Sequence, residues 1–240
     1  LKLTPGQTLL DIGCGWGALV MRAAERYGAH CVGITLSQNQ YERALERVRA
    51  AGLADRIEIR LQDYRDVQGQ FDRISSVGMF EHVGLKQLPG YFRRINELLA
   101  EDGLALNHGI TTSDVENRDT PFGAGSFIDR YVFPGGELPH LSLALRTAQQ
   151  GGLEVLDVEN LRRHYAHTLA LWSQNFENKH EAIRKLVNDA TFRIWRVYLI
   201  GCAHAFEHDQ ISIYQILCRK AGQSSSQLDW SRRYMYAGGD

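Results

Sequence analysis

A glycine-rich segment carries the strongest chemical signal in this chain. Residues 9–17 read LLDIGCGWG, so that three glycines alternate with other residues behind an aspartate. Glycines at this spacing let a backbone turn tightly from a strand into a helix and approach a ligand closely. We expect the segment to form part of a cofactor site, lined by Asp11, Gly13, Gly15, Trp16 and Gly17.

The ends of the next two apolar runs, at residues 30–35 and 57–62, indicate which cofactor this site binds. A dinucleotide site has the spacing G-x-G-x-x-G and an acidic residue at the end of the second strand to bind a ribose. In this chain the second apolar run ends with GIT at 33–35 and has no acidic residue there, so the groups that accept hydrogen bonds from the ribose must come from elsewhere. Thr35 and Gln40 are placed to supply them, with helix capping as the alternative. Tyr64 and Arg65 follow the third run, where a base would lie, with an ordinary surface loop as the alternative.

Short apolar runs alternate with amphipathic stretches through the first half of the chain. Strands are predicted at 8–12, 30–35, 57–62, 71–78 and 104–110, and helices at 18–27, 38–51 and 88–99. Repeated strand–helix units are typical of an α/β fold with parallel strands. We therefore predict a Rossmann-like, doubly wound, mostly parallel sheet with helices on both faces and ligands at the carboxyl edge.

The pattern changes in the second half. Residues 111–139 are rich in glycine, proline and aromatic residues, which predicts a long functional loop. Helices are then predicted at 141–151 and over most of 169–205, strands at 153–159 and 211–219, and a loosely held polar tail from Gln223. We predict one domain with a cofactor-binding half at 1–112, a substrate-covering half of helices and loops at 113–220, and a tail at 221–240.

Composition excludes several classes of protein. With 27 basic and 28 acidic residues the formal charge is −1, so no global basic field exists to hold nucleic acid. The four cysteines form no CxxC pair, which favours a reducing compartment. Since no run approaches the roughly 18 apolar residues of a membrane span, we expect a cytoplasmic protein. His204 and His208 lie four apart on a predicted helix, but two ligands alone make no convincing metal site, and no metal is expected.

Four segments, in order, carry a specific resemblance. They read DIGCGWG at 11–17, GITLSQNQ at 33–40, GMFEHVG at 78–84 and FIDRYVFPGGELP at 127–139. The first looks like the opening motif of class I methyltransferases, which use S-adenosylmethionine. Together the four resemble the cyclopropane-fatty-acid and mycolic-acid synthases, over most of residues 3–220.

The resemblance implies a reaction and its cofactors. S-adenosylmethionine would bind at the glycine loop and at Gly78. A lipid alkene would attack the sulfonium methyl, which leaves a carbocation on the acyl chain, and a bound bicarbonate would then take a proton as a cyclopropane ring closes. Such chemistry needs a positioned sulfonium, a base beside a cation, and walls that exclude water.

The resemblance also implies roles for individual residues. Glu81 would hold the bicarbonate through a shared proton, because two anions side by side repel each other. His108, the backbone N–H of Ile110 and the hydroxyl of Tyr165 would donate to the same anion. The alternatives are a carboxylate at a helix start for Glu81, a satisfied core histidine for His108 and a half-buried anchor for Tyr165.

Three aromatic residues of the predicted loop complete this set. Phe127, Tyr131 and Phe133 would line the acyl path, where ring faces stabilise a passing cation, or they would simply pack on the core.

One departure from the family pattern concerns the start of the chain. Family members carry N-terminal helices that cover the substrate and the cofactor, and a cysteine upstream of the glycine loop that completes the bicarbonate site. Leu1 lies directly before the first predicted strand, and Cys14 lies inside the glycine loop, so it is not that cysteine. We therefore expect either a preceding segment in the native protein or a chain that cannot perform the reaction.

The implied partner is an unsaturated phospholipid or another lipid acyl chain, met by peripheral contact at the inner membrane surface. A homodimer is possible, and no nucleic-acid partner is expected. Two other functions also stay open: a small-molecule methyltransferase with a different acceptor, and a homologue that binds S-adenosylmethionine without catalysis. The product, whether a cyclopropane, a methyl branch or a methylene, depends on how the carbocation is quenched.

Overall fold

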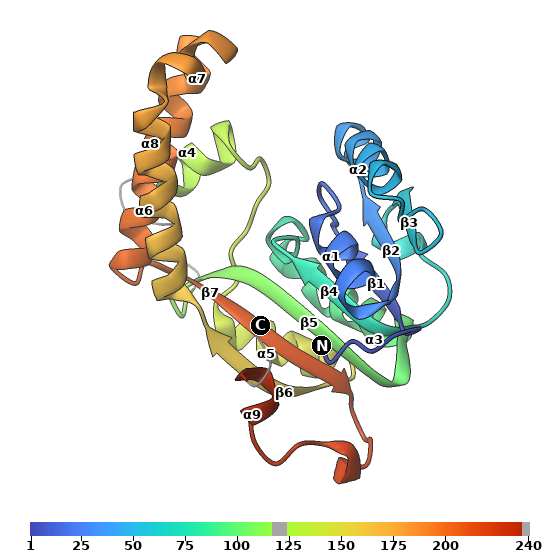
Figure 1. Ribbon diagram of the computed structural model, residues 1–240. Helices are drawn as coiled ribbons and strands as arrows, with labels where there is room; N and C mark the ends of the chain where they lie inside the picture. Colours follow the sequence, from blue (N-terminus) through green and yellow to red (C-terminus); the bar gives the residue numbers. More distant parts are fainter. Residues whose placement is uncertain (117–123, 237–240) are drawn as a thin grey trace.

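A seven-stranded sheet forms the centre of the molecule (Figure 1), in a computed structural model that describes residues 1–116 and 124–236. The strands are β1 (Thr8–Ile12), β2 (His30–Thr35), β3 (Ile57–Leu61), β4 (Phe71–Val77), β5 (Leu99–Thr112), β6 (Leu153–Asn160) and β7 (Ile211–Lys220). Their order in the sheet is β3-β2-β1-β4-β5-β7-β6. The first five strands are parallel, and β7 runs antiparallel to both of its neighbours. The predicted mostly parallel α/β sheet is confirmed.

Helices cover both faces of this sheet. The helices are α1 (Ala18–Tyr27), α2 (Gln38–Ala50), α3 (Leu88–Leu98), α4 (Ala124–Tyr131), α5 (Leu141–Gln150), α6 (Arg162–Asn178), α7 (His180–Leu186), α8 (Asp189–Glu207) and α9 (Arg233–Tyr236). Leu9 and Leu10 are neighbours on β1 and therefore point to opposite faces. Leu10 packs with α3 and α5 in what we call the sheet core, and Leu9 packs with α1 and α2 in the cofactor-side core.

Helices α6, α7 and α8 form a projection that we call the tower (Figure 1). α6 and α8 pack along each other, and α7 lies at the end farthest from the sheet. A third cluster, the tower core, joins these helices to the sheet through Ala166, Leu169, Leu199, Phe206 and Ile213. Among the described residues, none of the helices is both long enough and apolar enough to cross a membrane.

Local signals explain the helix ends that were predicted well. Gly28 ends α1 in the left-handed region with φ 65°, where a residue with a Cβ would be strained. Ser37 caps α2, because its side chain accepts a hydrogen bond from the backbone N–H of Gln40 at 3.3 Å.

Tertiary contacts explain the elements that were predicted wrongly. β5 begins at Leu99, before the predicted residue 104, because Leu99 pairs with Phe71 and its fully buried side chain packs over Gly103. α4 lies within the predicted loop 111–139. α6 begins at Arg162, before the predicted residue 169, where the Asn160 side chain accepts a hydrogen bond from the Arg162 backbone N–H at 2.8 Å.

The polar tail is more firmly attached than its composition predicts. The Arg219 guanidinium donates to the backbone carbonyls of Gln223 and Ser224, and Arg232 forms an ion pair with Asp157 on β6. These contacts hold the tail against the edge of the sheet at its β6 side.

Candidate active site

The glycine loop leaves an open space at the carboxyl edge of β1. Gly13, Gly15 and Gly17 have φ values of 81°, 54° and 78°, a region that residues with a side chain rarely adopt. A Cβ placed on Gly15 would meet no atom within 4 Å, and the same holds for Gly78 at the end of β4. The predicted loop therefore has the conformation and the free space that a bound cofactor needs.

Asp11 lies beneath this loop as a buried carboxylate. It is only 3% exposed, and the hydroxyl of Ser75 donates to its Oδ1 at 2.7 Å. Burial raises the pKa of Asp11 to about 6, against the opposing effect of the Ser75 hydrogen bond. At neutral pH the group is an anion in a poorly solvated place, which favours a cationic partner such as an ammonium group.

Thr35 and Gln40 lie together at the end of β2. The Thr35 hydroxyl donates to Gln40 Oε1 at 2.8 Å and accepts from the Ser37 backbone N–H at 3.1 Å. The Gln40 amide is therefore held by Thr35 and retains its two N–H donors. Trp16 is 51% exposed beside the loop, and its backbone carbonyl accepts from Arg47 at 2.6 Å.

Tyr64 and Arg65 follow β3 in the short helix η1 (Tyr64–Asp66), but their surroundings differ. The Tyr64 ring packs edge-on against Tyr91 with centroids 5.4 Å apart, and burial raises its pKa. The Arg65 side chain is exposed and forms two hydrogen bonds with Asp63, at 2.9 and 2.7 Å. Sequence reasoning gave Asp63 no role, although it directly follows a strand at the same edge of the sheet.

Glu81 lies on the short helix η2 (Phe80–His82) and is a second buried acid of this region. It is 7% exposed, its Oε1 accepts from the backbone N–H of Ile110 at 2.6 Å, and its Oε2 is buried without a partner among the described residues. Burial raises the pKa of Glu81 to about 7. The Ile110 amide, which was expected to donate to a bound anion, donates here to Glu81.

His108 and Tyr165 approach the same region from β5 and α6. His108 and Ile110 alternate along β5 and so point to one face, the face covered by α6. The ring centroids of His108 and Tyr165 are 6.2 Å apart. Burial lowers the pKa of His108, which favours the neutral imidazole, and burial together with the charge of Glu81 raises the pKa of Tyr165.

Two buried polar atoms of this group lack a protein partner. Besides Glu81 Oε2, the Nδ1 of His108 is buried without a hydrogen bond among the described residues. An unsatisfied buried polar atom costs about 1–3 kcal/mol, so such atoms in a native protein call for a ligand or water. Each of these two atoms is thus available for a hydrogen bond with a small polar ligand or a water molecule.

A row of aromatic rings leads away from Glu81. Next to Glu81, His82 packs edge-on against Phe133 at 5.6 Å between centroids. Phe133 contacts Tyr198 at 5.9 Å, and Tyr198 contacts Trp195 at 5.4 Å, both on α8. Of the three loop aromatics singled out in the sequence, the structure brings Phe133 to this row. Phe127 and Tyr131 contact each other on α4 at 5.4 Å.

The histidine pair on α8 lies outside this site. The rings of His204 and His208 are stacked with centroids 4.0 Å apart. Within residues 1–116 and 124–236, no group of three or more histidine, cysteine, aspartate or glutamate side chains could hold a metal ion.

Comparison with known proteins identifies the family. The family described as "Mycolic acid cyclopropane synthetase" matches residues 1–216. The chain belongs to the mycolic acid cyclopropane synthetase family. The solved structure of the cyclopropane synthase MmaA2 from Mycobacterium tuberculosis superposes with a TM-score of 0.87 at 31% identity, over 92% of this chain and 80% of that one. A mycolic acid cyclopropane synthase, CmaA1, complexed with SAH and CTAB gives 0.85 at 35% identity, over the same shares.

Curated members of the family are longer than this chain. A "Probable fatty acid methyltransferase" of Pseudomonas putida is 49% identical over 98% of this chain and 61% of its own length. The "Cyclopropane-fatty-acyl-phospholipid synthase" of Escherichia coli K12 is 36% identical over 90% of this chain and 54% of its own length. The chain thus spans between half and two thirds of these two relatives.

Proposed function

We propose that this chain transfers a one-carbon unit from S-adenosylmethionine to the double bond of an unsaturated fatty acyl chain of a phospholipid, forming a cyclopropane ring. The observation that carries this proposal is the buried group of Glu81, His108 and Tyr165 next to an open glycine loop, in a chain of this family. The row of aromatic rings that begins at His82, next to Glu81 in the chain, favours an apolar acceptor over a polar one.

The open space beside Gly15 and Gly78 fits the cofactor. When bound, S-adenosylmethionine supplies an electrophilic methyl group on a sulfonium centre. Asp11 is placed to pair with its ammonium group, and Thr35 with Gln40 to bind its ribose hydroxyls. Tyr64 and Trp16 are placed to pack against its apolar surfaces, and Arg65 to flank the base.

Glu81, His108 and Tyr165 fit a bicarbonate ion, which would supply the base that accepts the proton released as the ring closes. A carboxylate beside an anion is repulsive unless one of them is protonated. The pKa of about 7 allows Glu81 to carry a proton and to donate it from Oε2, while Ile110 holds Oε1 in place. In this proposal His108 and the Tyr165 hydroxyl, whose rings lie 6.2 Å apart, donate to the same anion.

The aromatic row supports an acyl acceptor. The alkene electron pair forms the new carbon–carbon bond as the carbon–sulfur bond breaks, so a cation develops on the acyl chain. Rings such as Phe133 and Tyr198 stabilise a nearby cation by about 0.5–2 kcal/mol each. We further propose that the protein works in the cytoplasm in peripheral contact with the inner membrane surface, where such acyl chains lie.

A second product has specific support. Relatives named as fatty acid methyltransferases share 49% and 44% identity with this chain, which favours a methyl branch or a methylene as the alternative to a ring. A ring and a methylene both lose a proton from the transferred carbon, the methylene after a 1,2-hydride shift along the acyl chain, so the same base would serve either outcome. A saturated methyl branch would in addition need a hydride donor to reduce the cation.

The test is mass spectrometry of unsaturated phospholipid vesicles incubated with S-adenosylmethionine and the longest natural form of the protein. A phospholipid that gains one CH2 unit and loses its alkene indicates the ring. The same mass gain with an alkene retained indicates a methylene. Glu81→Gln should lose most of the turnover and keep cofactor binding, with Glu25→Gln at an exposed position of α1 as the matched control. Cofactor binding by calorimetry without any mass gain would contradict the proposal.

A further inference from the structure

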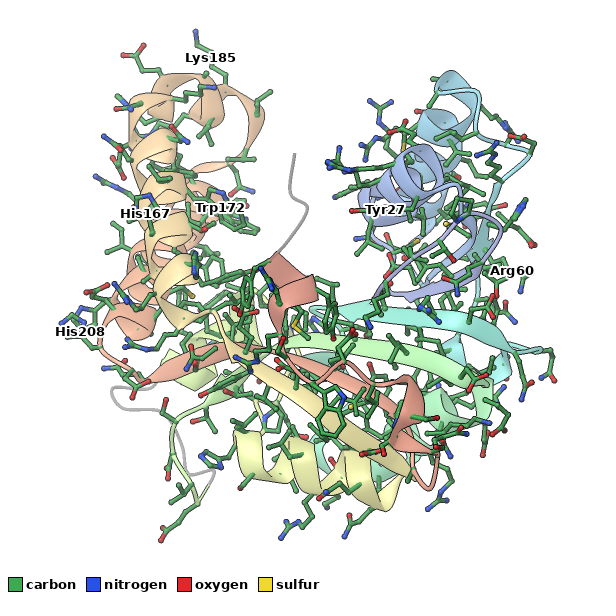
Figure 2. The ribbon with its side chains drawn as sticks, turned by 60° about the horizontal axis from the view of Figure 1, so that its bottom comes forward. Tyr27, Arg60, His167, Trp172, Lys185 and His208 are labelled. Atoms are coloured by element: carbon green, nitrogen blue, oxygen red, sulfur yellow. The ribbon has the colours of Figure 1, made fainter. Side chains whose placement is uncertain are left out.

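The end of the tower exposes apolar side chains far from the sheet. We call residues 179–195 the tower tip; it comprises α7 and the start of α8, and Figure 2 shows Lys185 at its extremity. Leu186 is 82% exposed and Val187 is 37% exposed. Val187 has an extended backbone between the two helices, and Asn188 caps α8 by accepting from the Thr191 backbone N–H at 2.8 Å. The break in the helix therefore fixes an apolar corner toward solvent.

Basic side chains surround this corner. The tower tip carries Lys179, Arg184, Lys185 and Arg193 against the two acids Glu181 and Asp189, whereas the whole chain has a net charge of −1. None of the four basic residues forms an ion pair with an acidic side chain of the described residues. The acid Glu177 on the neighbouring turn is already paired with Arg196 at 2.5 Å. Arg184 lies over the ring of Phe192 at 4.8 Å from its centroid, a contact that leaves its charge unneutralised, so the tower tip keeps an excess of positive charge toward an anionic surface.

The tower tip is also continuous with the candidate active site. Trp195 is 43% exposed at the upper end of the aromatic row, which runs through Tyr198 and Phe133 to His82 beside Glu81. Tryptophan favours the boundary between headgroups and hydrocarbon, because its ring is apolar and its N–H is polar. An acyl chain that leaves a bilayer at the tip would meet apolar rings along the way to the site.

We propose that the tower tip docks on the surface of an anionic phospholipid bilayer. Leu186 and Val187 enter the headgroup layer, and Arg184 and Lys185 contact the phosphates beside them. The assignment rests on the proposed function, because an acyl acceptor in a bilayer is what requires the site to meet one. Exposed apolar corners combined with basic residues are the features by which peripheral proteins bind such surfaces.

The test is flotation of the protein with two kinds of vesicle: pure phosphatidylcholine, and phosphatidylcholine with added phosphatidylglycerol. We compare the double variant Lys185→Glu/Leu186→Ser with the control Arg56→Glu/Trp230→Ser. The control makes the same charge change, before β3, and a larger loss of exposed apolar surface, in the tail, where Trp230 is fully exposed. S-adenosylmethionine affinity, measured by calorimetry, serves as the folding check for both variants.

The tip variant should lose roughly tenfold or more of its binding to the anionic vesicles, while the control binds like the wild type. Raised salt should weaken wild-type binding because it screens the charges. Equal binding of the tip variant and the wild type, or no preference for anionic vesicles, would overturn the assignment. So would a wild type that binds no vesicle, which would direct the search to a protein that carries the acyl chain. Wild-type binding that depends on the tip, without any mass gain in the lipid, would support the docking and contradict the proposed reaction.

Discussion

Glu81 has two oxygens in very different situations. Oε1 accepts a short hydrogen bond from the Ile110 backbone, whereas Oε2 is buried without a partner among the described residues. Burial dominates, so the pKa rises from 4.5 to about 7 even though the Ile110 hydrogen bond acts in the opposite direction. The folded protein therefore binds a proton on Glu81 more tightly than the unfolded chain does. As a consequence, the free energy of unfolding depends on pH.

Replacing Glu81 with glutamine should stabilise the protein increasingly as the pH rises. Below pH 4.5 the carboxyl is protonated in both states, and burying it costs no charge. Between pH 4.5 and about 7 the unfolded chain ionises first, so the wild type loses up to about 3 kcal/mol that the uncharged amide of Glu81→Gln keeps. Melting temperatures of both proteins from pH 4.5 to 8 check this, with the exposed Glu25→Gln as control. A difference that does not change with pH would contradict the expected protonation.

The contact between η2 and β5 depends on the absence of a side chain at Gly109. A Cβ at Gly109 would lie 2.0 Å from Cε1 and 2.3 Å from Cδ1 of Phe80, a side chain that is 1% exposed. Phe80 directly precedes Glu81, and Gly109 directly precedes Ile110. Because the Phe80 ring packs directly on the backbone of Gly109, the next residues in each segment, Glu81 and Ile110, are held close enough to form their hydrogen bond.

Gly109→Ala should displace Phe80 and with it Glu81. We expect a loss of about 1–3 kcal/mol in the free energy of unfolding and a turnover at least about tenfold lower, with unchanged S-adenosylmethionine affinity. Adding Phe80→Leu should restore part of the turnover, because the smaller side chain makes room for the new methyl. Gly90→Ala on α3 is the control, since a Cβ there meets nothing within 4 Å. Denaturant unfolding and the lipid assay measure both effects; full turnover in Gly109→Ala would show that Phe80 does not position Glu81.

Elements with local signals were predictable, and elements defined by distant partners were not. Short local sequence patterns define the glycine loop, the end of α1 at Gly28 and the Ser37 cap of α2. The ends of the first four strands were therefore predicted to within one residue. The start of β5 depends on Phe71 across the sheet. The hydrogen bond from Ile110 to Glu81 joins residues far apart in the sequence, so the family motif pointed to both residues and only the structure shows that they contact each other.

The whole molecule divides its proposed tasks between separate hydrophobic clusters. The glycine loop rests on the cofactor-side core, where Val20 Cγ2 lies 3.9 Å from the position of a Cβ on Gly17. Tyr165 belongs to the tower core, where its ring lies 5.2 Å from that of Phe206. The two clusters share no residue, so a cavity in one should leave the geometry of the other largely intact.

Matched core substitutions should therefore separate cofactor binding from transfer. Val20→Ala, which removes buried methyl groups under the loop, should cost about 1–3 kcal/mol of stability and weaken S-adenosylmethionine binding. Phe206→Leu should cost about 1–2 kcal/mol and lower turnover by loosening Tyr165, with cofactor affinity unchanged. Calorimetry and the lipid assay, both run well below the melting temperature of each variant, give the two readouts. If both variants lost affinity and turnover in the same proportion, the two clusters would act as one unit, and the division proposed here would be wrong.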